Sequence, residues 1–143
     1  MTSRSLAPRV GTALLVLRIV LGMTMVAHGY QKLFVFGFAG VSGGFAQMGI
    51  PMPGVVGPLI ALLEFFGGIA LIIGLFTRLA AVGMAADMLG AMIMVHLKNG
   101  FFMPTGFEFV FVLLGISIAI ALAGAGDFSA DDAIARHRSA SRP

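Results

Sequence analysis

Cysteine and tryptophan are both absent from this sequence of 143 residues, and tyrosine occurs once. Without a thiol, the chain itself cannot exchange disulfides, hold an iron–sulfur cluster through thiolates or use a cysteine nucleophile. Charged residues are also scarce, at 10% of the chain, whereas soluble domains contain about 25%. This composition excludes an ordinary soluble domain and favours a membrane protein.

Apolar sequence takes the place of the missing charge, and hydrophobic residues make up 59% of the chain. Each of four apolar runs approaches the ~20 residues that cross a bilayer core of ~30 Å. We therefore predict an all-α integral membrane four-helix bundle over residues 1–126, followed by a polar tail over residues 127–143. The predicted spans are about Leu14–Tyr30, Val55–Phe76, Leu79–Leu97 and Phe107–Ala123.

The first run follows basic residues, as a signal peptide would, but Arg18 interrupts it and no small-x-small cleavage site follows. It is expected to be an uncleaved span. With four spans, two loop lysines, Lys32 and Lys98, lie on one side of the membrane. Six arginines lie on the other: Arg4, Arg9, Arg78, Arg136, Arg138 and Arg142. The positive-inside rule then predicts a bacterial inner-membrane protein with both termini in the cytoplasm. Because the basic residues mark this orientation, the net charge of +3 is explained by topology, and no nucleic-acid partner is predicted.

Two shorter helices are predicted outside the spans. Residues 45–50 carry apolar side chains spaced for a short helix at the membrane interface, which Pro51 and Pro53 would end. In the tail, Ser129 followed by Asp132 is typical of a helix N-terminus.

Small residues recur at spacings that let membrane helices approach closely. Two such faces are Gly57, Ala61, Glu64 and Gly68 in the second span, and Gly115, Ala119 and Ala123 in the fourth. Because Glu64 lies on a small-residue face, its carboxylate is predicted to point into the bundle.

Three ionisable residues, Arg18, Glu64 and Asp87, interrupt three of the apolar runs. A charge in the bilayer centre costs roughly 2.5–3.5 kcal/mol, so such residues face a partner or a cavity. One cation and two acids at similar depth predict a buried ion network. Glu64 is expected to contact either Arg18 or the face of the first span that carries His28 and Lys32. A network with a purely structural role is the alternative.

A further set of polar residues converges on the predicted outer side, where spans end or begin. We predict a pocket there with catalytic residues His28, Glu64 and Glu108, and ligand-binding residues Tyr30, Gln31, Lys32 and His96. Asp87 and His96 are nine positions apart, so both face the centre only if the third helix is irregular; otherwise one of them contacts a partner subunit.

Several of these residues also have structural interpretations. Lys32 is typical of an interfacial anchor, the two histidines of polar bridges between helices, and Glu108 of a charge that favours a helix N-terminus. The ten methionines are expected to pack the bundle rather than to bind copper, and no metal site is predicted.

Ordered motifs along nearly the whole chain resemble the DoxX family of small bacterial four-span membrane proteins. The motifs occupy residues 28–32, 45–51, 63–68, 71–78, 96–100, 106–108 and 124–129. The resemblance implies a four-helix bundle. By analogy with the thiosulfate:quinone oxidoreductase subunits that gave the family its name, it also implies quinone-linked redox chemistry in sulfur, thiol or oxidative-stress metabolism.

Two function classes follow. In the first, a redox subunit binds a quinone near the outer leaflet; His28 and Lys32 donate hydrogen bonds, Glu64 and Glu108 relay protons, and a soluble or membrane partner supplies electrons. Haem ligation by His28 and His96 is a variant of this class. In the second, the chain is a non-catalytic membrane scaffold or a small-solute carrier with a polar interior. Both classes include a homo-oligomer as an option.

Overall fold

The computed structural model describes residues 7–141, so the predicted basic residues Arg4 and Arg142 lie outside the described part. Helices dominate the described residues, which contain no β-strand. The α-helices are α1 Ala7–Tyr30, α2 Gly37–Gln47, α3 Pro53–Leu62, α4 Gly68–Ile73, α5 Thr77–Ala91, α6 Glu108–Ala123 and α7 Ala130–Ala140.

Three short π-helical segments interrupt these helices without ending them. Gln31–Phe36 follows α1, Leu63–Gly67 joins α3 to α4, and Met92–His96 continues α5 into a 3₁₀ turn at Leu97–Asn99. The resulting continuous helices are long and apolar enough to cross a membrane: Arg9–Gln47, Pro53–Ile73 and Thr77–Asn99. The shorter α6 is apolar as well. The predicted helical membrane bundle is therefore confirmed.

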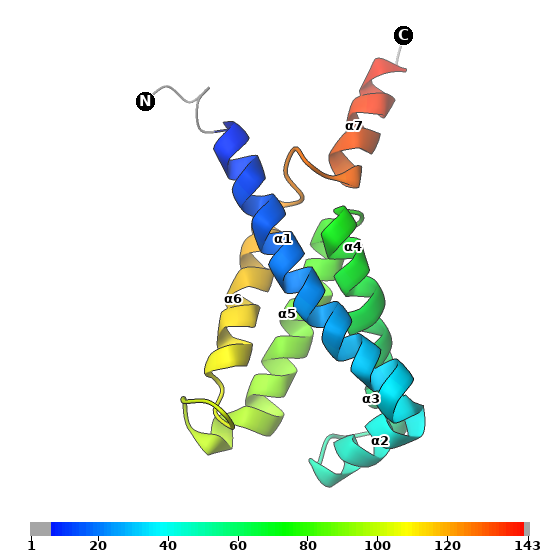
Figure 1. Ribbon diagram of the computed structural model, residues 1–143, viewed down its shortest axis with the longest axis vertical. Coiled ribbons are helices and arrows are strands. Elements are labelled where there is room, and N and C mark those ends of the chain that lie inside the picture. Colours follow the sequence, from blue (N-terminus) through cyan, green and yellow to red (C-terminus); the bar gives the residue numbers. More distant parts are fainter. Residues whose placement is uncertain (1–6, 142–143) are drawn as a thin grey trace.

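The crossing helices pack in two groups (Figure 1). The long α1 runs diagonally against α4 and the segment Leu63–Gly67, whereas α5 pairs with α6. The start of α1 lies at one end of the bundle, here called the tail end, which also carries α7 and the turn before α5. The opposite end, with α2 and the loop of residues 98–107, is called the pocket end. Side chains of Leu21, Leu71, Met84 and Ile120 are fully buried between the two groups.

Glycines set how closely α1 approaches the second crossing helix. A Cβ atom on Gly22 would lie 2.7 Å from the carbonyl oxygen of Gly68, and a Cβ atom on Gly29 would overlap the backbone of Phe65. Only glycine fits such contacts, so they fix the register between the two helices. The small-residue face predicted for the second span is confirmed, since Gly57, Ala61, Glu64 and Gly68 are all buried.

The small-residue face predicted for the fourth span does not pack within this chain. Gly115, Ala119 and Ala123 are exposed. Larger side chains of α6 face the bundle instead, namely Val110, Leu113, Ser117 and Ile120. A wide apolar stripe gains more contact with α5 than a row of small residues would, which explains the difference.

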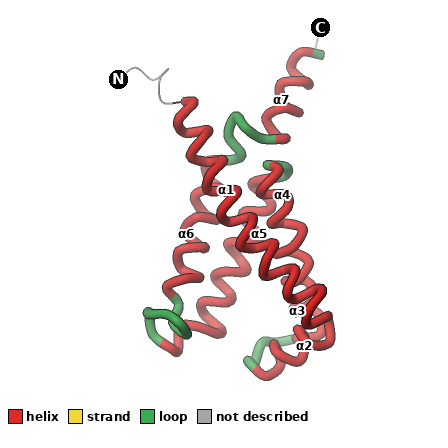
Figure 2. Tube along the Cα trace, viewed as in Figure 1, coloured by secondary structure: helices red, strands yellow, loops and turns green. Residues whose placement is uncertain are grey.

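The helix between the first two spans is longer than predicted and begins earlier. The residues predicted for it were 45–50, but α2 covers Gly37–Gln47, and Pro53 begins α3 instead of ending α2. Gly37 adopts φ 67°, ψ 169°, a conformation open to glycine that lets α2 turn away from α1. Figure 2 shows α2 at the pocket end, beside α3. The glycine-rich sequence of α2 does not predict a helix, because glycine has a low helix propensity. The helix is stabilised by close packing on α3 at Gly57.

The tail begins as predicted. Ser129 has an extended backbone, and its Oγ accepts a hydrogen bond of 3.1 Å from the backbone N–H of Asp132, which caps α7. Figure 1 shows α7 projecting from the tail end of the bundle. The first turn of α7 contacts the end of the second crossing helix, through a hydrogen bond of 2.9 Å from Asp131 N–H to the Gly74 carbonyl.

Candidate functional site

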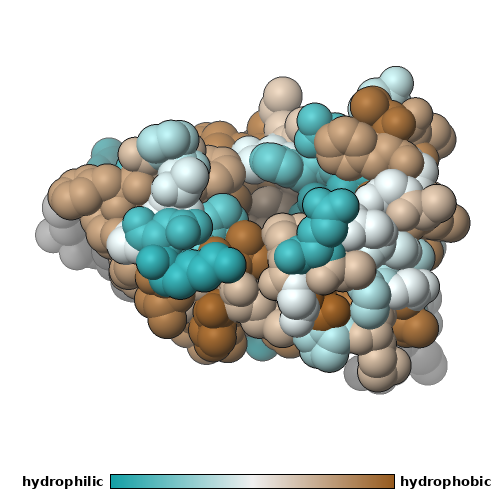
Figure 3. Space-filling view, turned by 90° about the horizontal axis from the view of Figure 1, so that it is seen from below, coloured by the Kyte–Doolittle hydropathy of each residue, from teal (hydrophilic) through white to brown (hydrophobic). Residues whose placement is uncertain are grey.

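A cavity of about 230 Å³ opens at the pocket end, between the α1–α3 group and the α5–α6 pair. Figure 3 looks onto this end, where hydrophilic side chains gather around a hollow. Apolar side chains supply most of the wall, and four polar residues enter it. The lining residues are Met25, His28, Lys32, Glu64, Met88, Ala91, His96, Met103, Pro104, Gly106, Phe109, Val110 and Leu113.

An ion pair lines the cavity. Lys32 Nζ lies 2.5 Å from Glu64 Oε2, and their side chains are 18% and 5% exposed. Glu64 was predicted to contact either Arg18 or the face of α1 that carries Lys32, and the structure confirms the second option. The contact depends on the close crossing at Gly29, because Gly29 lets the backbone of α1 touch the π-helical segment that carries Glu64.

Three polar residues of the cavity each lie inside a π-helical segment: Lys32 in Gln31–Phe36, Glu64 in Leu63–Gly67 and His96 in Met92–His96. A π-helical turn holds more residues than an α-turn, so it rotates the following side chains relative to an unbroken helix. Such segments occur frequently at functional sites. Their presence in three crossing helices marks this end of the bundle as the candidate site.

The irregularity also answers the question raised by the spacing of Asp87 and His96. An ideal helix would place them on opposite faces, but the π-helical segment Met92–His96 lies between them. Asp87 is 9% exposed, and His96 lines the cavity. The irregular third helix therefore turns both residues inward.

Asp87 lies close enough to Glu64 and Lys32 to interact electrostatically with both. Its Oδ2 atom is buried and has no hydrogen-bond partner among residues 7–141. Of the predicted network of Arg18, Glu64 and Asp87, the structure therefore contains the two acids but not the arginine. The two acids do lie together, but the cation beside them is Lys32.

Arg18 belongs to the tail end. Its side chain is fully buried, and it donates hydrogen bonds to the carbonyl oxygens of Leu71 and Phe128. No ion pair joins Arg18 to Glu64 within residues 7–141. The tail was not predicted as a partner of Arg18, because residue 128 is remote in the sequence from the first span.

The two histidines occupy different positions around the cavity. His28 is exposed and lines the cavity from α1. His96 Nδ1 lies 3.0 Å from the Thr105 carbonyl oxygen. Since a carbonyl can only accept, Nδ1 carries the hydrogen and donates it. Asn99 Nδ2 donates to the same oxygen at 3.2 Å, which anchors the loop over this side of the cavity.

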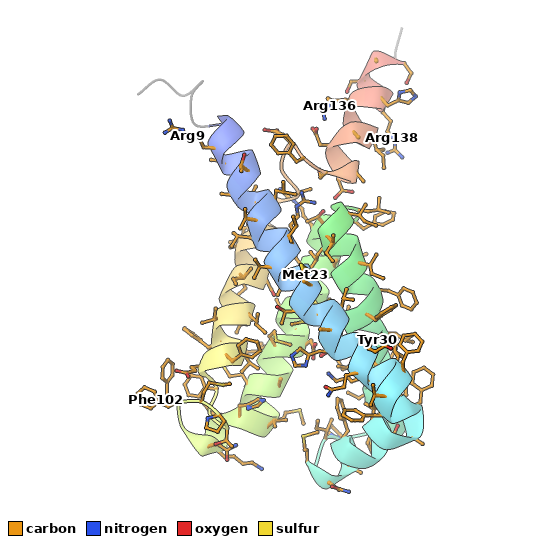
Figure 4. The ribbon with its side chains drawn as sticks, in the orientation of Figure 1. Arg9, Met23, Tyr30, Phe102, Arg136 and Arg138 are labelled. Carbon is orange, nitrogen blue, oxygen red and sulfur yellow. The ribbon has the colours of Figure 1, made fainter. Side chains whose placement is uncertain are left out.

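Three residues of the predicted site lie outside the cavity. Tyr30 is exposed and packs on Phe34, with ring centroids 5.0 Å apart; Figure 4 shows it pointing away from the bundle. Gln31 is also exposed. Glu108 accepts a hydrogen bond of 2.9 Å from the Met103 backbone N–H, so it stabilises the loop. The wall of the cavity within the described residues therefore does not include these three residues.

The methionines of the wall were not predicted as site residues. Met25 and Met88 are almost fully buried, and Met103 reaches the cavity from the loop. Nothing in their sequence spacing distinguishes them from the other methionines of the bundle. Their flexible thioethers suit a wall that adapts to an apolar ligand.

A second, open groove lies at the tail end, where Arg78, Asp127 and Asp131 are among the lining residues. Asp131 accepts hydrogen bonds of 2.8 and 2.9 Å from the backbone N–H groups of Phe76 and Thr77 at the start of α5. Burial alone would raise the pKa of Asp131, but these N–H groups and the nearby Arg18 lower it below its usual range. Asp131 therefore joins the tail to the bundle as an anion.

Comparison with known proteins identifies the family. The chain is 35% identical over 100 residues to the Bacillus subtilis (strain 168) protein named "Putative oxidoreductase CatD", which covers 69% of this chain and 71% of that protein. It is 32% identical over 91 residues to the Mycobacterium tuberculosis (strain H37Rv) "Uncharacterized membrane protein Rv3486", covering 64% of this chain and 54% of that one.

A third relative is the Escherichia coli (strain K12) "Inner membrane protein YqjF", 38% identical over 68 residues, which cover 48% of this chain and 49% of that protein. No solved structure matches the chain. The family model for DoxX matches residues 13–97, which hold every polar residue of the cavity. This match covers more than half of the sequence, and the chain is a membrane protein that belongs to the DoxX family.

Proposed function

We propose that this chain is the membrane subunit of a quinone-linked redox system and that the quinone ring binds in the cavity at the pocket end. One observation carries the proposal: three polar residues from separate π-helical segments meet in a single cavity with apolar walls. Ligand sites in proteins are typically apolar clefts with a few converging polar groups. The oxidoreductase name of the Bacillus subtilis relative supports the redox class.

The residues present fit a quinone ring. Met25, Phe109 and Leu113 offer apolar and aromatic surface, and the His28 imidazole and Lys32 ammonium can donate hydrogen bonds to ring carbonyls. A bound quinone would supply two-electron, two-proton redox chemistry. The protein would orient the ring, exclude water from it through the apolar wall, and provide protons through Glu64. Electrons would come from a soluble or membrane partner that oxidises a sulfur or thiol compound.

Purified protein tests the proposal directly. A quinone should be extractable from it, and a soluble quinone analogue should bind the quinone-free form. His28→Ala should weaken that binding by at least tenfold, whereas Tyr30→Phe, on the outside of the same helix, should leave it unchanged. Equal weakening by both variants, or no binding by the wild-type protein, would contradict the proposal.

The redox step needs a second assay. Thiosulfate-dependent reduction of a quinone should occur with co-purified membrane partners and should be lost when His28 is substituted. A visible-region spectrum of the same sample tests the alternative hypothesis that His28 and His96 hold a haem, because haem absorbs strongly in this region.

A second candidate function is that of a non-catalytic membrane scaffold or small-solute carrier. The Lys32–Glu64 pair favours it, since this contact joins the first two crossing helices without any ligand. A colourless preparation without quinone, together with unchanged growth of cells that carry His28→Ala, would support this candidate over the first.

We further propose that the chain lies in the bacterial inner membrane with both termini in the cytoplasm. Arg9, Arg136 and Arg138 all lie at the tail end (Figure 4), as expected for the cytoplasmic side under the positive-inside rule. A reporter that is active only in the cytoplasm should be active when fused after Pro143, whereas a reporter that is active only outside the cytoplasm should be inactive there. Moving Arg78 to the loop at the pocket end should weaken this orientation without reversing it, because the other tail-end arginines remain.

A further inference from the structure

The charges behind the cavity do not balance if every group is ionised. Glu64 and Asp87 are 4% and 9% exposed, and one ammonium, that of Lys32, lies beside them. Two carboxylates and one cation leave a surplus negative charge in the interior of a membrane protein. Such a surplus is costly, and buried acids commonly relieve it by taking up a proton.

Within residues 7–141, no second lysine or arginine lies beside these acids to balance the charge. The helices α4 and α6 pack against α5, but α4 carries no charged residue, and the one in α6, Glu108, bonds to Met103. Around the cavity, the remaining titratable groups are His28, exposed, and His96, whose Nδ1 faces the Thr105 carbonyl. Arg18 is engaged at the tail end.

The hydrogen bonds around Asp87 also indicate a bound proton. Asp87 Oδ2 is buried and lacks a hydrogen-bond donor among the described residues. An unpaired carboxylate oxygen in such a place is costly. A proton would remove the charge and turn the carboxyl group from an acceptor into a donor. Two nearby carboxyls that share one proton are a known solution where both cannot ionise together.

We propose that Glu64 and Asp87 together hold one exchangeable proton behind the cavity, with the Lys32 ammonium as their fixed counter-charge. Asp87 is not among the described residues that line the cavity, so it stores the proton, and Glu64, which lines the cavity, passes it on. Lys32 keeps Glu64 in place at 2.5 Å while the proton moves between the acids.

Delivery of this proton rests on the function proposed above, whereas the shared proton itself does not. When an oxygen of the bound ligand becomes an anion, the O–H bond of Glu64 breaks and the ligand oxygen gains the proton. The pair is then left with two carboxylates beside one ammonium. The surplus charge draws a new proton from water by way of the exposed His28, which restores the starting state.

Infrared spectroscopy of the ligand-free protein in lipid nanodiscs tests the proposal. At neutral pH the wild type should show the C=O stretch of a protonated carboxyl, and this band should shift in D₂O. Asp87→Asn should abolish the band, and so should Glu64→Gln, because a single remaining acid would ionise beside Lys32. Asp131→Asn, at the tail end, is the matched control and should leave the band unchanged.

The absence of this band from the wild type at neutral pH would overturn the proposal, as would its survival in both Asp87→Asn and Glu64→Gln. Asparagine has the shape of a protonated aspartic acid, so Asp87→Asn should also keep wild-type folding yield, whereas a fall in yield for this variant alone would mean that Asp87 is needed as an anion. Because no ligand is present, this result is independent of whether the protein binds a quinone.

Discussion

The two ends of the bundle both bury ionised groups, but they satisfy them differently. At the tail end, the hydrogen-bond partners of the charged side chains are backbone groups: Arg18 donates to two carbonyls, and Asp131 accepts from two N–H groups. At the pocket end, side chains face one another, with Lys32 against Glu64 and an acid close by. Backbone partners cannot change protonation, whereas side-chain partners can.

This difference separates structure from function within one small bundle. At the tail end, Arg18 and Asp131 carry one charge of each sign, and their hydrogen bonds join α1, α4, the start of α5 and the tail. The pocket end has one acid in excess, an open cavity and three irregular helical segments. Perturbed charges gathered in a cleft are typical of a functional site.

The largest expected effect comes from removing the cation of the pocket end. Lys32→Met leaves Glu64 and Asp87 buried without a counter-charge, and breaking such a pair costs roughly 3–5 kcal/mol. Unfolding in mixed micelles would measure the loss. Lys98→Met is the matched control, because Lys98 is exposed at the same end and should change stability by less than about 0.5 kcal/mol. Equal losses in the two variants would mean that the ion pair contributes nothing.

Double-mutant cycles sharpen the comparison between the ends. Glu64→Gln combined with Lys32→Met should show a coupling energy of about 0.5–3 kcal/mol, because the two side chains are in contact. Glu64→Gln combined with Arg18→Met should be additive within about 0.5 kcal/mol, because Arg18 has its partners at the tail end. Coupling between Glu64 and Arg18 of the size expected for Lys32 would contradict the separation of the two ends.

Sequence reasoning predicted the burial of Glu64 and its contact with the first span, because the small-residue face around Glu64 determines its direction. It could not choose between Arg18 and Lys32 as the cation, since both lie on a suitable face of an ideal helix. Hydrophobic periodicity carries no sign of a π-helical turn, and that turn is what brings His96 and Asp87 to the same side. The role of Asp131 depends on a contact between the tail and residues 76–77, which no local pattern encodes.

At the tail end, Asp131 should give the protein a specific acid sensitivity. Its pKa is lower in the folded protein, so its contribution is present above the unfolded pKa of about 3.9 and is lost as the pH falls below that value. Asp131→Asn should cost about 1 kcal/mol at neutral pH, as loss of a helix cap does. The difference in stability between wild type and variant should vanish in strong acid. Asp127→Asn, with an exposed side chain, should show no such pH dependence.

Glu108→Gln should give the smallest effect, although the sequence position of Glu108 at the pocket end suggested catalysis. Its carboxylate accepts from the Met103 N–H, and an amide oxygen can accept the same bond, so Glu108→Gln should keep both stability and binding of a quinone analogue. Glu108→Ala removes the acceptor and should cost about 0.5–1.5 kcal/mol. If Glu108→Gln abolishes binding while its stability is unchanged, then the ionised carboxylate acts on the ligand, and the site extends beyond the cavity to the start of α6.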